Sequence, residues 1–139
     1  MLVEPKDVSD WWSRLPANGP DSERRLLFPK SIRLRSRRDY LRVQRGGIRV
    51  SSKDLLVFYR KNEKEHPRFG TTVSKKVGNA VVRNRVKRCL REAIRHHQHC
   101  LTASVDVVFI ASPRAASLPY RDLEQNVLGA LHQIARREQ

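Results

Sequence analysis

The most informative stretch of the chain covers residues 69–97 and reads FGTTVSKKVGNAVVRNRVKRCLREAIRHH. Its first part, up to Lys75, is rich in aromatic and β-branched residues, which predicts a strand. Gly78 and Asn79 then break the pattern, and the Asn79 side chain can cap a helix by accepting a backbone N–H. From Ala80 the spacing becomes helical, so the stretch predicts a strand, a short turn and a long helix.

The predicted helix is apolar on one face and cationic on the other. Its apolar positions recur every three or four residues, as on one buried helical face: Val82, Val86, Cys89, Leu90 and Ala93. The opposite face and its two borders carry Arg83, Asn84, Arg85, Lys87, Arg88, Arg91 and Arg95. Glu92 can pair with Arg88 at i−4, but one carboxylate cannot neutralise this row.

Such a row of like charges costs free energy unless a polyanion or counterions neutralise it, and the simplest polyanion is nucleic acid. A solvated basic face without a partner is the alternative. It is less favoured, because most charged helices mix both signs.

Charge is unevenly distributed along the chain. The 139 residues hold 29 Lys and Arg against 14 Asp and Glu, a net charge of +15. Residues 1–30 contribute five of each, so the whole net charge falls in residues 31–139. We expect a mostly disordered extension over residues 1–30 and one compact domain over residues 31–139. Trp11 and Trp12 in the extension could contact the domain, dock a partner, stack on RNA or do nothing.

The compartment expected from the sequence is the cytoplasm, with no membrane partner. No apolar run approaches the ~20 residues that span a bilayer, and the N-terminus has no signal-peptide pattern. Cys89 and Cys100 make no disulfide framework. Cys89 lies on the apolar helical face and should pack as a small hydrophobic residue.

A short basic helix is predicted before the strands. Ser36 and Asp39 resemble a capping box at its start, and Gly46 and Gly47 should end it in the left-handed conformation. Tyr40 is either half-buried core or an exposed stacking platform. Its cations are Arg37, Arg38, Arg42 and Arg45.

Strands are predicted at residues 48–51, 55–61 and 68–75, the last two as an antiparallel hairpin. Residues 105–111 are nearly all apolar and suit a central strand. Pro119 opens a final amphipathic helix. The order indicates an α+β fold whose sheet buries one face against helices and leaves the other face, or a groove beside it, for a ligand.

Residues suited to catalysis are sparse. The carboxylates of the domain are scattered, without a pair spaced to hold divalent metals. His96 and Cys100 stand at i, i+4, but they lack a second ligand cluster, and the helix dipole already accounts for histidines at a helix C-terminus. We expect a binder without a metal site. Arg, Asn and aromatic residues together favour RNA, because single-stranded bases stack on Tyr or Phe.

Residues 73–93, VSKKVGNAVVRNRVKRCLREA, resemble the signature of the bacterial ribonuclease P protein subunit. Residues 83–85 match its Arg-Asn-Arg triplet. The similarity extends over residues 33–134 and includes residues 38–40 and 110–113.

The resemblance implies a two-layer α+β sandwich of order α-β-β-β-α-β-α, with a four-stranded sheet and a left-handed crossover through the basic helix, against the usual preference. It also implies a ribonucleoprotein endonuclease in which a large RNA hydrolyses precursor tRNA with Mg²⁺. The protein would be its non-catalytic subunit, bound one to one and holding no cofactor itself. It would hold the 5′ leader of precursor tRNA in a cleft between the first helix and the sheet.

Carried over residue by residue, the resemblance assigns two surfaces. The leader cleft comprises Tyr40, Lys53 and Phe58, with Tyr59 replacing Phe58 if the alignment shifts by one residue. The surface for the catalytic RNA comprises Lys75, Lys76, Asn79, Arg83, Asn84, Arg85, Lys87, Arg88, Arg91 and Arg95.

Two positions depart from the family pattern. Gln44 stands where a second aromatic residue is common, and Ser112 stands where a basic residue precedes Pro113, although Arg114 is close by. Two other classes of function explain the sequence less well. A structural ribosome-associated RNA-binding protein would fit the charge and fold but not a cleft with aromatic residues, and a protein-only nuclease would need an acidic metal cluster.

Overall fold

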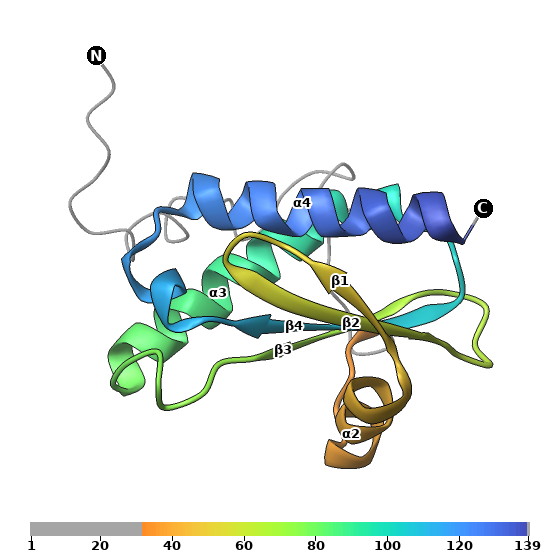
Figure 1. The fold of residues 1–139 in the computed structure, drawn as a ribbon, viewed down its shortest axis with the longest axis horizontal. Coiled ribbons are helices and arrows are strands. Elements are labelled where there is room, and N and C mark those ends of the chain that lie inside the picture. The colour runs from red at the N-terminus through yellow and green to blue at the C-terminus, as the bar shows by residue number, and fades with distance from the viewer. Residues whose placement is uncertain (1–31, 139) are drawn as a thin grey trace, which may run out of the picture.

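The computed structural model describes residues 32–138, which form three α-helices and one four-stranded sheet (Figure 1). The predicted extension over residues 1–30, with Trp11 and Trp12, lies outside the described residues. The predicted order α-β-β-β-α-β-α is confirmed: α2 (Arg37–Gly46), β1 (Ile48–Ser51), β2 (Leu55–Lys61), β3 (Arg68–Thr72), α3 (Ala80–His97), the 3₁₀ turn η4 (Gln98–Cys100), β4 (Val105–Ala111), the 3₁₀ turn η5 (Pro113–Ser117) and α4 (Tyr120–Arg137).

The strands lie in the order β1-β2-β4-β3. β4 pairs antiparallel with β2 and parallel with β3, so the predicted hairpin between residues 55–61 and 68–75 is wrong. The physical reason is β4 itself, in which every residue except Ile110 is buried, so that burial on both faces places it inside the sheet. β3 also ends at Thr72, short of Lys75. The chain crosses from β3 to β4 through α3, and the left hand of this crossover stays a prediction.

The helices cover the two faces of the sheet unequally. α3 and α4 lie together over one face and α2 lies on the other (Figure 1). The main core fills the space under α3 and α4, where Tyr59, Phe69 and Phe109 of the sheet are fully buried. A small second cluster beneath α2 joins Leu34, Val43 and Val108 with the half-buried Tyr40, Phe58 and Ile110. None of the helices in residues 32–138 is long and apolar enough to cross a membrane.

Local signals set the starts of α2 and α3. The Ser36 hydroxyl accepts a hydrogen bond from the Asp39 N–H at 3.1 Å, and the Asn79 side chain accepts one from the Val82 N–H at 3.0 Å. The left-handed end predicted for α2 is wrong, because Gly47 is extended, with φ −89°. Gly47 instead allows close packing, since a Cβ there would lie 2.3 Å from the Val43 carbonyl oxygen.

Candidate nucleic-acid interface

The cationic face of α3 is presented to solvent, as its periodicity predicted. Asn79, Asn84, Arg88 and Arg91 are exposed, as are Lys75 and Lys76 in the turn before the helix. Arg83, Lys87, Arg85 and Arg95 are half-buried. The predicted RNA-binding residues therefore lie together on α3 and the turn that precedes it.

Arg85 and Arg95 of this surface have well-defined partners within the protein. Arg85 donates hydrogen bonds to the carbonyl oxygens of Ala116 and Leu118, which ties α3 to η5 and to the residue that follows it. Arg95 forms an ion pair with Glu92 at 2.6 Å. Both cations are held in place by these contacts, so a ligand would meet preformed positions there.

An open groove of about 410 Å³ lies between α2 and the end of β3. Its walls are formed by Arg35, Arg37, Tyr40, Leu41, Gln44, Thr71, Thr72, Val73 and Lys87. Lys87 belongs to the basic face of α3, so the groove and that face meet at this residue. The contributions of Arg35, Arg37 and Lys87 to the groove were not predicted. Arg37 could have been predicted, because it lies three residues before Tyr40 and therefore on the same side of the helix.

Tyr40 is half-buried, which is the first of the two alternatives that the sequence left open. Its ring belongs to the second cluster, yet it also lines the groove. The ring packs against Gly70, where any added Cβ would lie 2.7 Å from ring atoms. Burial raises the pKa of the Tyr40 hydroxyl, while a hydrogen bond with the Thr71 backbone and the charge of Arg91 act in the opposite direction.

The aromatic residues of β2 point to opposite faces of the sheet, as successive strand residues must. Phe58 lies on the α2 side, in the same cluster as Tyr40, although it does not line the groove itself. Tyr59 is 1% exposed in the main core, and its hydroxyl donates to Glu138 at 3.4 Å. Phe58 is therefore the aromatic of this pair that lies on the cleft side.

Lys53 lies apart from the groove walls, in the exposed turn between β1 and β2. The next residue, Asp54, is 3% exposed, and its carboxylate accepts a hydrogen bond from Asn126 at 3.2 Å. The guanidinium of Arg114 is 3.6 Å from the other Asp54 oxygen and is 70% exposed. Arg114 therefore places a cation beside the Lys53 turn, whereas the Ser112 hydroxyl is buried.

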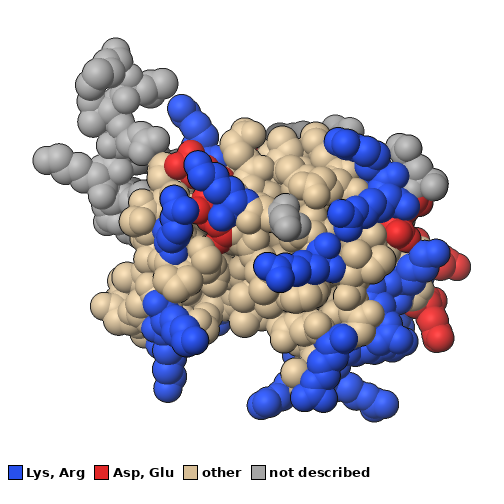
Figure 2. Space-filling view, viewed as in Figure 1, with Lys and Arg blue, Asp and Glu red and all other residues tan. Residues whose placement is uncertain are grey.

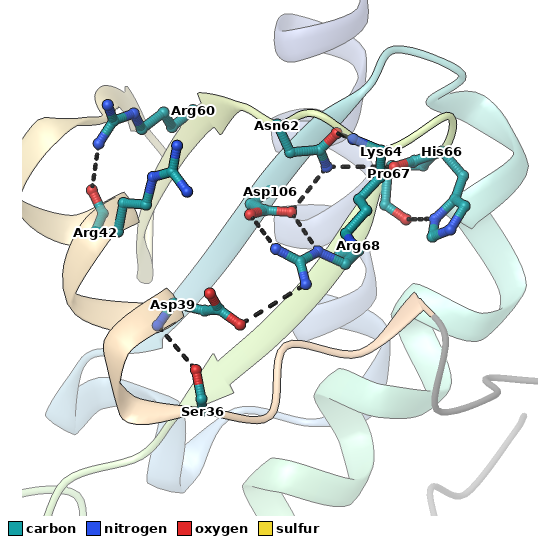
Figure 3. Close-up of polar contacts among 10 residues, drawn as sticks. All are labelled: Ser36, Asp39, Arg42, Arg60, Asn62, Lys64, His66, Pro67, Arg68 and Asp106. Atoms are coloured by element: carbon teal, nitrogen blue, oxygen red, sulfur yellow. Dashed lines mark hydrogen bonds and ion pairs between the residues drawn. The ribbon is translucent and has the colours of Figure 1, made fainter.

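An ion pair between β3 and β4 also reaches the first turn of α2 (Figure 3). Asp106 in β4 is 5% exposed and accepts two hydrogen bonds from Arg68 of β3, at 2.8 and 2.7 Å. Asn62 donates a third at 2.8 Å. The same guanidinium is 3.7 Å from Asp39 of α2. We call Asp39, Arg68 and Asp106 the α2 clasp. Asp106 was not predicted to take part in such a contact. It could have been recognised as the one charged residue in an otherwise apolar strand.

The remaining residues that the sequence singled out are Cys89, His96 and Cys100. Cys89 is fully buried, and burial raises the pKa of its thiol to about 11. His96 is 3.5 Å from Glu92, and the Cys100 sulfur is 3.8 Å from His99. Within residues 32–138 no group of three or more His, Cys, Asp or Glu side chains is arranged to hold a metal ion.

Basic side chains dominate the surface around α2. Figure 2 shows Lys and Arg projecting from the lower part of the molecule, where α2 lies in Figure 1, with few acidic side chains in view. Fold and surface together define a small basic α+β protein, in which a cationic helix adjoins a groove that contains the Tyr40 ring.

The chain belongs to the ribonuclease P protein family. Residues 28–135 match the family described as Ribonuclease P. The chain is 41% identical over 100 residues to the ribonuclease P protein component of Syntrophus aciditrophicus, covering 72% of this chain and 84% of that relative. The resemblance stated from residues 73–93 is therefore confirmed. The family acts in tRNA processing as part of a ribonucleoprotein nuclease, and membership implies partnership with ribonuclease P RNA.

Solved structures agree with this membership. The RNase P protein of Staphylococcus aureus superposes with a TM-score of 0.69 at 32% identity, covering 79% of this chain and 100% of that one. The RNase P protein from Thermotoga maritima gives a TM-score of 0.67 at 28% identity, covering 73% and 96%. The predicted α+β fold is confirmed.

Proposed function

We propose that this chain is the protein subunit of a ribonuclease P ribonucleoprotein, one copy per catalytic RNA, and that it promotes removal of the 5′ leader from precursor tRNA. Residues 31–139 would be its RNA-binding domain, acting in the cytoplasm. The RNA would carry out hydrolysis with Mg²⁺, and the protein would supply binding and positioning.

The observation that carries this proposal is the junction at Lys87. This side chain lies on the cationic face of α3 and also lines the groove beside Tyr40. A folded RNA bound along α3 would therefore lie next to a single strand bound in the groove. A leader that emerges from a complex of catalytic RNA and precursor tRNA requires that arrangement.

The groove has the chemistry for a single strand. The half-buried ring of Tyr40 offers a face for one base, and stacking of this kind contributes about 1–3 kcal/mol per base. Arg35, Arg37 and Lys87 around it can contact phosphates. Gln44 offers an amide where the family often has an aromatic ring, so hydrogen bonding would replace stacking at that position.

The surface on α3 has the chemistry for a folded RNA. Its exposed members can each approach a phosphate and release a counterion, which makes binding steeply dependent on salt. Arg85 and Arg95 would hold the surface in shape as well as add charge, because their guanidinium groups are already anchored at η5 and Glu92.

Precursor tRNA cleavage by a bacterial ribonuclease P RNA at low Mg²⁺ tests the proposal. The wild-type chain should restore cleavage that the RNA alone performs poorly. Arg88→Glu should abolish the rescue, because a charge reversal in the middle of α3 repels the RNA. Arg136→Glu makes the same reversal at an exposed position of α4 and should leave the rescue intact. Failure of the wild-type chain to rescue its cognate RNA would overturn the proposal and favour a ribosome-associated role.

A further inference from the structure

The outer face of α2 carries a second group of cations, away from α3. Four arginines of the helix and one from β2 surround a shallow hollow of about 670 Å³. All five are exposed. We call them the α2 arginine surface: Arg37, Arg38, Arg42, Arg45 and Arg60.

These charges are close together and lack carboxylate partners among residues 32–138. None of the five guanidinium groups forms an ion pair with a described acid. The one acid of α2, Asp39, is turned toward Arg68 in the α2 clasp. A helix of ten residues is only about 15 Å long, so the repulsion within this group is considerable unless an anion neutralises it.

The fold holds one of these cations in place. The Arg60 guanidinium donates a hydrogen bond to the Arg42 carbonyl oxygen at 3.5 Å, which brings a β2 charge against the helix (Figure 3). Gly46 leaves room for it, because a Cβ at that position would lie 2.9 Å from Arg60 Nη1. Planar guanidinium groups suit phosphate oxygens, to which they can donate two parallel hydrogen bonds.

The α2 arginine surface is continuous with the groove. Arg37 and Leu41 line both the hollow and the groove, so the two adjoin at these residues. A single strand that leaves the groove over Arg37 would pass directly onto Arg38, Arg42 and Arg45.

We propose that the α2 arginine surface binds the phosphate backbone of leader nucleotides upstream of those in the groove. This inference rests on the proposed function, because it extends the same bound strand. The contacts are to phosphates, so the surface would recognise leader length and not leader sequence.

Leader-length dependence of precursor tRNA binding tests this inference. The full chain, assembled with the catalytic RNA, would be titrated with tRNA that has no leader, a short leader that fills the groove, or one extended by about six nucleotides. The variant is Arg38→Gln with Arg42→Gln. The control, Arg121→Gln with Arg136→Gln, removes two exposed charges from α4.

The double variant should bind the long-leader substrate about tenfold more weakly at about 0.15 M salt, with a salt slope lower by about 1.4. Its affinity for the short-leader and leaderless substrates should equal that of the control. An equal loss on all three substrates would overturn the inference, since the surface would then contact the catalytic RNA or the tRNA body. No loss on any substrate would overturn it too.

A different result would refute the proposed function itself. A wild-type complex that gains nothing from even the short leader would refute leader binding as a whole, whatever the arginine variants do. Unchanged folding of the double variant, checked by circular dichroism and by its binding to leaderless tRNA, keeps the comparison valid.

Discussion

The two arginine-rich helices of this chain lie on opposite faces of one sheet and are anchored in different ways. α3 has 18 residues, of which five are buried in the main core: Val86, Cys89, Leu90, Ala93 and Ile94. α2 has ten residues, of which only Val43 is buried. Besides Val43, α2 is held by the half-buried Tyr40 in the second cluster and by the ion pair between Asp39 and Arg68.

One fold therefore presents two kinds of cationic surface. α3 is a fixed platform, because its apolar face is part of the core that holds the domain together. α2 depends on a small cluster and on the clasp, so it can open locally at lower cost than global unfolding. A fixed platform suits a permanent RNA partner, and a more adjustable wall suits a substrate strand that must enter and leave.

The largest expected effect comes from the core beneath α3. Leu90→Ala should lower the free energy of unfolding by about 2–5 kcal/mol, because Leu90 is fully buried and its truncation leaves a cavity in the core. Val43→Ala beneath α2 should cost only about 2 kcal/mol. Urea unfolding measures both. Native-state hydrogen exchange should show the Val43 variant opening at α2 alone, and an equal loss of protection in α3 would contradict the distinction.

An intermediate effect is expected from the α2 clasp. Asp106→Ala should lower the free energy of unfolding by about 3 kcal/mol, because it leaves the Arg68 charge partly buried without its main partner. Glu63→Ala in the exposed loop between β2 and β3 is the control. The Asp106 variant should also lose preference for leader-bearing tRNA while it still binds the catalytic RNA. Retained leader preference would show that the clasp does not position Tyr40.

The smallest effect concerns Cys89 on the buried face of α3. With its pKa raised to about 11, the thiol should react with an alkylating reagent at pH 8 about a hundredfold more slowly than a thiol of ordinary pKa. Folding raises this pKa, so the folded chain keeps a proton that the unfolded chain loses above pH 9, and stability should fall as pH rises from 9 to 11. Mass spectrometry after alkylation should find Cys100 labelled first. Equal labelling would mean that α3 opens readily.

Local chemistry predicted the elements well because their signals lie within a few residues. The Asn79 cap, the spacing from Val82 to Ala93 and the apolar run of β4 each correspond to an observed feature. Strand order could not be obtained in this way. The β2 and β3 segments are joined by a short turn that favours a hairpin locally, yet the burial of β4 on both faces decides the pairing.

The candidate site was predictable by residue type and less so by role. Arg85 and Arg88 are chemically the same on a helical wheel, but only the structure shows that Arg85 reaches the carbonyl groups at η5. Lys87 was predicted to belong to the α3 surface. That it also lines the groove depends on how closely α2 approaches β3. Gly70 sets that approach, and its contact with Tyr40 spans 30 residues of chain.

The most direct test of leader binding in the groove is the ratio of affinities for precursor and mature tRNA, measured in the assembled complex with wild-type chain and with Tyr40→Ala. Loss of one stacked base should remove about 1–3 kcal/mol of binding free energy from the precursor alone, so this ratio should fall roughly 5- to 150-fold. Gln125→Ala on the exposed side of α4 should leave the ratio unchanged. If Tyr40→Ala weakens precursor and mature tRNA equally, the groove does not hold the leader.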